Sequence, residues 1–148
     1  MVYAESSAVL AWLLGEPTAE TVRQALAEAE AVVTSDLTLV ECDRVLVRAV
    51  VEGRLLEAEA TGRQGRLANA AAHWTLLTVS PEVLARARRP FPLEPIRTLD
   101  ALHLATALRA RASGVPVAVL ALDHRIRDCA ARLGFEVQPA SEADAARG

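Results

Sequence analysis

Short apolar stretches alternate along this chain with longer segments of helical periodicity. Five stretches have the length and composition of buried strands, and they cover residues 2–4, 31–34, 74–79, 115–122 and 135–138. The helices predicted between them cover residues 8–14, 18–30, 38–52, 55–72, 81–88, 98–112 and 123–133. No two-residue hairpin signal joins any two strands, so the chain must cross over through helices. The pattern predicts an α/β fold, a three-layer α/β/α sandwich with a central, mainly parallel sheet of about five strands.

Capping residues and glycines refine the predicted helices. The side chains suited to cap a helix start are Ser6, Ser7, Thr18, Thr38, Ser80 and Thr98. Thr38 and Glu41 also have the spacing of a capping box. Gly62 and Gly65 lie inside the fourth predicted helix, where each costs about 1 kcal/mol. We therefore expect that helix to be broken or bent.

Length and composition fit one domain with a sizeable core. The chain has 148 residues, and its apolar share of 52% exceeds the share of about 45–50% usual in soluble domains. Aromatic residues make up only 3%, so the core must consist mainly of Ala, Leu and Val, which suits helices packed on a sheet. We expect a single domain over residues 1–140, followed by a frayed C-terminal tail at residues 141–148.

Charge and cysteine content limit the functional classes. The formal net charge of −3 provides no overall attraction to a polyanion, so any nucleic-acid contact requires a local basic patch. No apolar run reaches transmembrane length, and the expected location involves no membrane. Cys42 and Cys129 are far apart, without metal-ligand spacing, as expected of reduced, buried thiols. The cytoplasm is therefore the predicted compartment.

Four acidic residues are predicted to lie at one end of the sheet. Glu5 follows the first strand and Asp123 the fourth, while Glu41 and Asp100 lie near the starts of two helices. Ligands of an open parallel sheet bind outside the carboxyl ends of its strands. Acids also favour helix starts as caps and through the helix dipole, so for each residue taken alone a capping role remains open.

The surroundings of these acids favour a shared site. Glu41, Asp100 and Asp123 all stand beside apolar segments. Carboxylates that converge next to a low-dielectric core repel one another unless a proton, a partner or a cation neutralises them. A hard divalent ion with oxygen ligands is the simplest solution, and Mg²⁺ or Mn²⁺ suits such ligands.

The blocks around these acids resemble the ordered acidic motifs of the PIN-domain family, and most of all those of its VapC-type toxins from bacterial toxin–antitoxin pairs. The blocks are residues 3–8, 38–41, 99–107 and 121–123, and residues 130–137 are similar to the closing helix and strand of that family. The block around Asp100 is the most specific. The resemblance covers nearly the whole chain.

This resemblance implies a PIN-like fold and a metal-dependent endoribonuclease. Glu5, Glu41, Asp100 and Asp123 fall where the family has its four acids. They would hold Mg²⁺ or Mn²⁺, which activates a water for in-line attack on an RNA phosphodiester. The family also implies a homodimer and a cognate antitoxin protein whose peptide docks over the site.

Two positions depart from the family pattern. Glu5 stands where relatives usually have Asp, and Ala121 where they often have a hydroxyl. The extra methylene of Glu5 moves its carboxylate by about 1 Å, a displacement that can cost on the order of a hundredfold in rate. A degenerate PIN fold that binds RNA or protein without cutting is therefore the alternative function. An unrelated α/β domain whose acids are only caps is a third hypothesis, and it predicts carboxylates that point in different directions.

Further residues are candidates for supporting roles. Ser7 and His103 could support the acids, although His103, three residues after Asp100, could equally be a ligand, a general base or a packing histidine. The candidates for binding RNA phosphates are Arg86, Arg88, Arg89 and Arg97, which flank a proline-rich loop. These arginines could also form an ordinary solvated face.

Overall fold

The computed structural model describes residues 1–140, and the tail predicted at residues 141–148 lies outside them. The described residues contain five strands in one sheet, and every neighbouring pair is parallel. The strands are β1 (Val2–Ala4), β2 (Val32–Ser35), β3 (Thr75–Leu77), β4 (Ala118–Leu120) and β5 (Glu136–Gln138), in the spatial order β3-β2-β1-β4-β5. The predicted α/β/α fold is confirmed.

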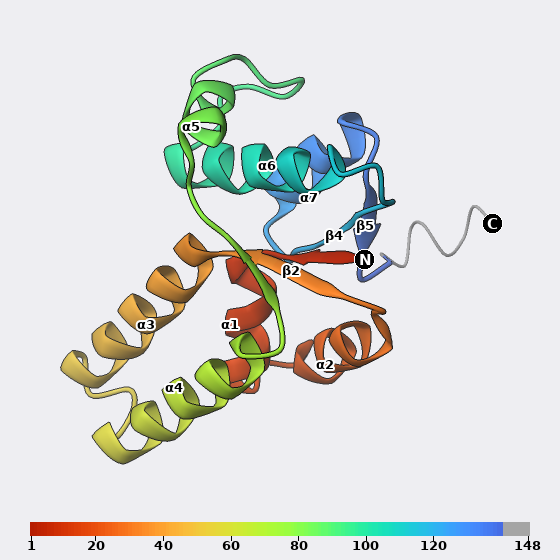
Figure 1. The fold of residues 1–148 in the computed structure, drawn as a ribbon. Coiled ribbons are helices and arrows are strands. Elements are labelled where there is room, and N and C mark those ends of the chain that lie inside the picture. Colours follow the sequence, from red (N-terminus) through yellow and green to blue (C-terminus); the bar gives the residue numbers. More distant parts are fainter. Residues whose placement is uncertain (141–148) are drawn as a thin grey trace.

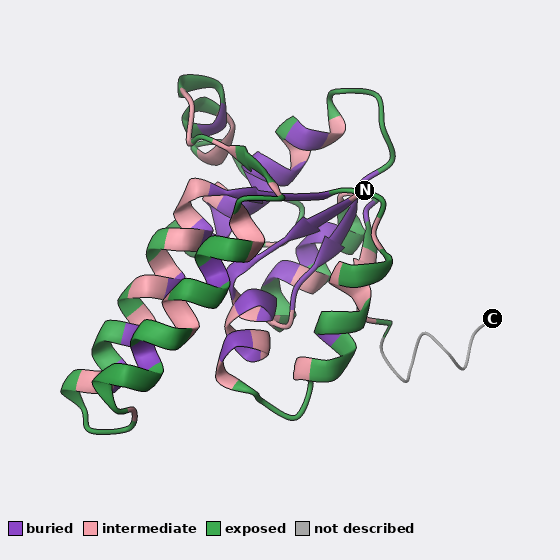
Figure 2. Ribbon diagram, turned by 60° about the horizontal axis from the view of Figure 1, so that its bottom comes forward, coloured by how far each residue is buried: buried purple, intermediate pink, exposed green. Residues whose placement is uncertain are grey.

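Helices cover both faces of this sheet (Figure 1). Those on one face are α1 (Ser6–Leu14), α2 (Ala19–Glu28), α3 (Asp36–Val51) and α4 (Glu57–Ala71). Those on the other face are α5 (Pro81–Ala87), α6 (Thr98–Arg111) and α7 (His124–Arg132). Two separate hydrophobic clusters fill the space between the layers. Figure 2 shows the same division, with buried strands inside and exposed residues on the outer faces of the helices.

Strand β1 is the centre of the sheet and of the topology. All its residues are at most 2% exposed, as expected of an apolar strand covered on both faces. The chain adds β2 and β3 on one side of β1 and β4 and β5 on the other. The strand order therefore changes direction between β1 and β4, and the loops that follow these two strands part there. Open α/β sheets bind their ligands at such a position.

Several helices begin at a different residue from the one predicted. Helix α3 starts at Asp36, and Ser35 caps it by accepting a hydrogen bond from the amide of Leu37 at 3.2 Å. Thr38 is buried inside the helix and accepts a hydrogen bond from the Thr34 hydroxyl at 2.9 Å. The predicted capping box between Thr38 and Glu41 is therefore wrong. The Glu41 side chain is free for other contacts.

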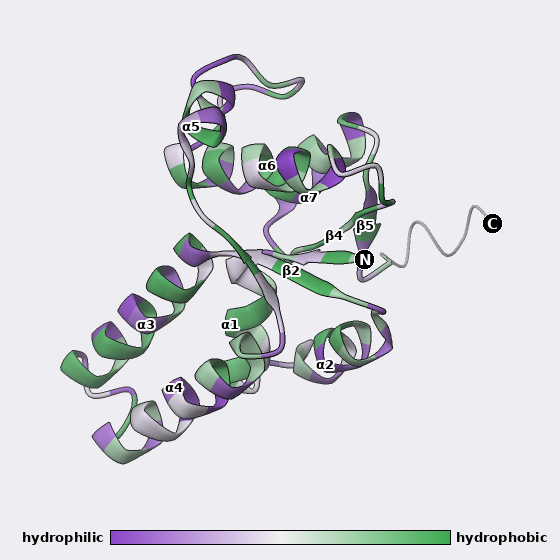
Figure 3. Cartoon of the chain, in the orientation of Figure 1, coloured by the Kyte–Doolittle hydropathy of each residue, from purple (hydrophilic) through white to green (hydrophobic). Residues whose placement is uncertain are grey.

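Helix α4 has no break, so of the two outcomes predicted for it, a broken or a bent helix, the first is wrong. A Cβ atom added at Gly62 or Gly65 would meet no other atom within 4 Å. Both residues are therefore exposed helix positions. The entropic cost of glycine at these positions is small enough for the neighbouring residues to keep the helix intact. In Figure 3, hydrophilic and hydrophobic residues alternate along α3 and α4. This pattern is typical of helices with one face on the core and one in solvent.

Candidate acidic active site

All four acids predicted from the sequence line one cavity of about 320 Å³. Glu5 follows β1, Asp123 follows β4 after two residues, Asp100 lies in the first turn of α6, and Glu41 lies in α3. The cavity therefore opens at the carboxyl ends of β1 and β4, as predicted. Its other lining residues are Ser6, Ser7, Leu10, Arg97, Thr98, Leu99 and Ile126.

Glu5 is the N-cap of α1, and the two serines after it hold its carboxylate. Its backbone is extended, and its Oε2 accepts a hydrogen bond from the amide of Ser7 at 2.9 Å. The hydroxyl of Ser7 also donates to Oε2, and the hydroxyl of Ser6 donates to Oε1 at 2.6 Å. The serines were predicted to cap this helix, whereas Glu5 performs that role. Three donors fix the carboxylate, which is only 3% exposed.

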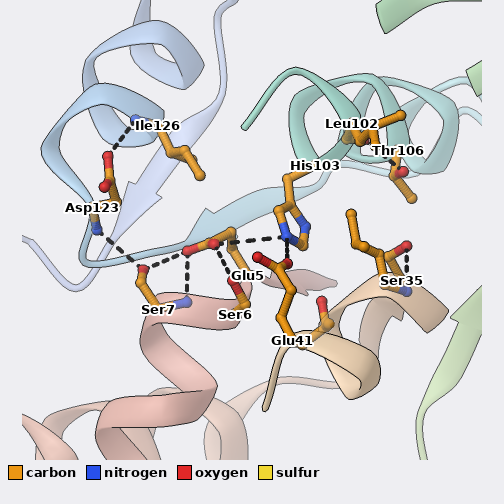
Figure 4. A network of polar contacts seen from close by, with 12 residues as sticks. Glu5, Ser6, Ser7, Ser35, Glu41, Leu102, His103, Thr106, Asp123 and Ile126 are labelled. Carbon is orange, nitrogen blue, oxygen red and sulfur yellow. Dashed lines mark hydrogen bonds and ion pairs between the residues drawn. The ribbon is translucent and has the colours of Figure 1, made fainter. Parts of the chain in front are cut away.

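Ser7 also contacts the loop that carries Asp123. The Ser7 hydroxyl oxygen accepts hydrogen bonds from the amides of Leu122 at 2.8 Å and Asp123 at 3.1 Å. Figure 4 shows the contact with Asp123. Asp123 caps α7 through its Oδ1, which accepts from the amides of Arg125 at 2.9 Å and Ile126 at 3.3 Å. Because both bonds use Oδ1, the other oxygen can serve a ligand in the cavity. One serine hydroxyl thus links two of the acids.

Asp100 is the acid with the most unfavourable surroundings. Its Oδ2 is buried and finds no hydrogen-bond partner within residues 1–140. Burial raises the pKa of this carboxyl, and the charges of Asp123 and Glu5 raise it further, while Arg97 and His103 act in the opposite direction. A buried, unpaired carboxylate oxygen costs free energy, and a bound cation would remove that cost.

Glu41 turns toward a buried histidine. The Nε2 atom of His103 lies 2.5 Å from Glu41 Oε1 and 3.8 Å from Glu5 Oε1, and Figure 4 shows the three side chains pointing toward one another. The other ring nitrogen, Nδ1, lies 3.0 Å from the hydroxyl of Tyr3. Burial and the charge of Glu5 raise the pKa of the Tyr3 phenol well above its ordinary value of 10.0. Both nitrogens of His103 therefore have partners.

The four predicted arginines occupy different places. Arg97 lines the acidic cavity at the N-cap position of α6, where Thr98 was predicted to be the cap. Arg86 lies over the ring of Phe91, with its guanidinium carbon 4.1 Å from the ring centroid, and donates to backbone carbonyls of the proline-rich loop. Arg88 and Arg89 are exposed just after α5 and do not line the cavity. Arg97 is thus the arginine placed to contact a ligand of the acids.

The arrangement is suited to a hard cation, although the side chains are not all converged on one point. Within residues 1–140, no group of three or more His, Cys, Asp or Glu side chains is close enough to form a ready-made metal site. The cavity nevertheless combines four carboxylates with an unpaired oxygen on Asp100. Oxygen donors of this kind are the ligands that Mg²⁺ and Mn²⁺ prefer. Asp100, Asp123, Glu5 and Glu41 are the residues that could hold such an ion.

Comparison with known proteins identifies the family of this chain. The family model described as the PIN domain matches residues 2–132. The chain belongs to the PIN-domain family. This PIN domain is 37% identical over 137 residues to Ribonuclease VapC46 of Mycobacterium tuberculosis, a match that covers 92% of this chain and 95% of that protein. The hypothesis that the chain is an α/β domain unrelated to this family is therefore wrong.

Solved structures share the fold at lower sequence identity. VapC20 of Mycobacterium tuberculosis, described as a sarcin-ricin loop cleaving toxin, aligns with a TM-score of 0.65 and 19% identity, over 94% of this chain and 100% of that one. A toxin–antitoxin complex from Klebsiella pneumoniae aligns with a TM-score of 0.56 and 19% identity, over 81% of this chain and 84% of that one. At these identities the likeness shows the fold.

Tyr3 is a polar neighbour of the site that the sequence did not single out, and Ser6 is a second one that was predicted only as a helix cap. Tyr3 lies in the apolar strand β1 and is 1% exposed, so its position is that of a core residue. A buried phenol needs a hydrogen-bond partner, and that requirement was the available signal. Its partner, His103, is a hundred residues away in the sequence, so only the fold reveals the contact.

Proposed function

We propose that this PIN domain is a divalent-metal-dependent endoribonuclease and the toxin of a toxin–antitoxin pair. The observation that carries the proposal is the shared cavity, which carboxylates from four separate segments line and where Asp100 keeps an unpaired buried oxygen. The identity of 37% to a protein named as a ribonuclease supports the same reaction. The substrate is RNA, and the bond cut is a phosphodiester.

Glu5, Glu41, Asp100 and Asp123 would hold Mg²⁺ or Mn²⁺ in this proposal. When bound, the ion supplies positive charge against the phosphate and lowers the pKa of water. The protein's own part is to position the carboxylates. Ser6 and Ser7 fix Glu5, Ser7 also fixes the backbone at Asp123, and His103 fixes Glu41.

Arg97 is the residue that we assign to the RNA phosphate. It is exposed and lines the same cavity as the acids, so its guanidinium can reach a phosphate there through charge-assisted hydrogen bonds. Arg88 and Arg89, exposed near the end of α5, would contact further phosphates along the RNA. The chain as a whole carries a net charge of −3, so RNA binding must depend on these local charges.

The partners that we propose are a cognate antitoxin protein and a second copy of the chain. A structural neighbour is a toxin–antitoxin complex, which supports the first of these. No helix in the described part of the chain is long and apolar enough to cross a membrane. We place the protein in the cytoplasm because Cys42 and Cys129 are free, buried thiols. Burial raises the pKa of the Cys42 thiol to about 12, which makes that residue unreactive.

Cleavage of RNA by the purified protein with Mn²⁺ or Mg²⁺ tests this function. Asp100→Asn keeps the shape of the side chain and removes its charge, so we expect a loss of roughly a hundredfold or more. Asp128→Asn is the matched control, because Asp128 is an exposed acid of α7 outside the cavity. Equal cleavage by the wild type and Asp100→Asn would contradict the proposal.

A degenerate PIN fold that binds RNA or a partner without cutting is the second candidate. The observation that favours it is the Glu5 carboxylate, which three donors already occupy, while Ala121 is fully buried and brings no hydroxyl to the site. This candidate predicts RNA binding without cleavage in either metal. Cleavage that starts on addition of Mn²⁺ and stops with a chelator would exclude it.

A further inference from the structure

A chain of three polar groups, two of them buried, leads from the core to the acidic cavity and connects three elements. Tyr3 comes from β1, His103 from α6 and Glu41 from α3. Their contacts are short, with 3.0 Å from the Tyr3 hydroxyl to His103 Nδ1 and 2.5 Å from His103 Nε2 to Glu41 Oε1. Tyr3 and His103 are each 1% exposed, so water does not compete for the bond between them. The Glu41 side chain is 22% exposed and faces the cavity.

The chemistry of the three groups fixes the direction of the hydrogen bonds. An ionised carboxylate only accepts hydrogen bonds, so the nitrogen that faces Glu41 must carry a proton. In a neutral imidazole the other nitrogen is then an acceptor, and the hydroxyl of Tyr3 must donate to it. With a neutral imidazole, the protons therefore run in one direction, from Tyr3 to His103 and from His103 to Glu41.

We propose that Tyr3 and His103 are positioning residues, with Tyr3 holding the proton of His103 on Nε2 so that His103 orients Glu41 within the acidic site. His103 then acts through Glu41, and its Nε2 lone pair is not available as a metal ligand. This is the supporting role that the sequence left open for His103, beside those of a metal ligand, a general base and a packing residue. The role of Glu41 toward a cation rests on the proposed function, whereas the position of the proton does not.

The Glu5 carboxylate also favours the tautomer that carries its proton on Nε2. Its Oε1 lies 3.8 Å from Nε2 of His103, beyond a hydrogen bond but close enough for a proton on that nitrogen to be attracted. In the opposite tautomer the Nε2 lone pair would face both Glu5 and Glu41. The imidazole would then repel the carboxylates that it contacts, and Glu41 would lose its donor.

The position of the proton can be measured without metal or RNA. Two-bond proton–nitrogen correlations in an NMR spectrum of the ¹⁵N-histidine-labelled protein distinguish the two neutral tautomers. We expect His103 to carry its proton on Nε2 in the wild type and its Nδ1 signal to shift in Tyr3→Phe, which removes only the hydroxyl that donates to Nδ1. The signals of His73 and His124, both exposed, should not change. A proton on Nδ1 in the wild type, or an unchanged Nδ1 signal in Tyr3→Phe, would overturn the proposal.

The effect on the acidic site is tested by Mn²⁺ binding, measured by calorimetry. His103→Gln keeps an N–H that can reach Glu41, and His103→Leu does not. Residues that orient metal ligands typically change affinity by about 10–100-fold, so we expect a loss in that range for His103→Leu and Tyr3→Phe but only a few-fold loss for His103→Gln. Equal affinity in His103→Leu and the wild type would refute the positioning role. Absence of Mn²⁺ binding in the wild type would instead refute the proposed function and leave the tautomer result standing.

Discussion

The hydroxyl of Ser7 connects two halves of the acidic cavity at the scale of a single residue. It donates to Glu5 Oε2 and accepts from the amides of Leu122 and Asp123. A serine oxygen has one proton and two lone pairs, so these three bonds use its whole capacity. The residue thereby fixes the distance between the end of β1 and the start of α7.

Replacing Ser7 by Ala should affect both stability and activity. Two backbone amides in a part-buried loop would lose their acceptor, which costs about 1–3 kcal/mol per group left unsatisfied. Cleavage should fall by roughly tenfold or more, because Glu5 and Asp123 lose a common anchor. Urea unfolding and an RNA cleavage assay measure the two effects. Ser113→Ala is the control, since Ser113 donates to one helix carbonyl far from the cavity, and equal behaviour of the two variants would contradict this account.

The length of the Glu5 side chain should decide which metal ion supports activity. Glu5→Asp shortens the side chain by one methylene and keeps a residue that is well suited to cap a helix. Mg²⁺ demands near-octahedral geometry, so we expect this variant to gain activity with Mg²⁺ more than with Mn²⁺. The ratio of the two cleavage rates is the measurement. A fall of both rates by the same factor would show that Glu5 is already in its best position.

The sequence predicted where the acids lie but not how each is held. The ends of β1 and β4 and the starts of α3 and α6 follow from local periodicity, so the common edge was predictable. The contacts of Glu41 were not, because the nearby Thr38 matched a capping box and the true partner, His103, is 62 positions away. Arg86 could not be separated from Arg97 by sequence, because both flank the same loop and only packing against Phe91 distinguishes them.

At the scale of elements, α4 differs most from its prediction. Propensity alone favoured a break at Gly62 and Gly65, yet the helix runs from Glu57 to Ala71 without one. Its buried residues, Ala60 and Leu67, lie seven positions apart on the same face. Packing of that face on the layer below therefore outweighs the cost of two exposed glycines.

Replacing Gly62 and Gly65 by Ala should therefore stabilise the protein. Neither added Cβ meets another atom within 4 Å, and Ala is favoured over Gly in a helix interior by about 0.5–1 kcal/mol. The midpoint of urea unfolding should rise for each variant, and the two effects should add for the double variant. RNA cleavage should not change, because α4 contributes no residue to the acidic cavity. A lower midpoint would mean that α4 needs these glycines to bend.

At the scale of the whole molecule, the acidic cavity makes the metal-free fold less stable than it could be. Burial and the charges of Asp123 and Glu5 raise the pKa of Asp100 above its ordinary value of 3.8. The folded state therefore binds that proton more tightly than the unfolded state. This tighter binding of the proton stabilises the folded state at low pH. As the pH rises from about 3.8 through the raised pKa, Asp100 ionises in the folded state and the free energy of unfolding loses this stabilisation.

Asp100→Asn should accordingly stabilise the metal-free protein while it removes activity. The gain in the free energy of unfolding should be small at about pH 4 and full at about pH 7, because Asp123 and Glu5 repel Asp100 only when it is ionised. Urea unfolding at both pH values in the presence of a chelator measures it. Added Mn²⁺ should reverse the order, since an ion that binds only the folded wild type stabilises it. A wild type more stable than Asp100→Asn at neutral pH without metal would contradict this account.

The most direct test of the central claim is the position of Mn²⁺ in a crystal of the wild-type protein. Anomalous scattering locates the ion independently of any assay. The account predicts a peak inside the cavity of Glu5, Glu41, Asp100 and Asp123, with the Asp100 Oδ2 oxygen at a ligand distance of about 2.0–2.6 Å. It also predicts that this peak is lost in Asp100→Asn. A wild-type crystal with Mn²⁺ bound elsewhere and none between these carboxylates would contradict it.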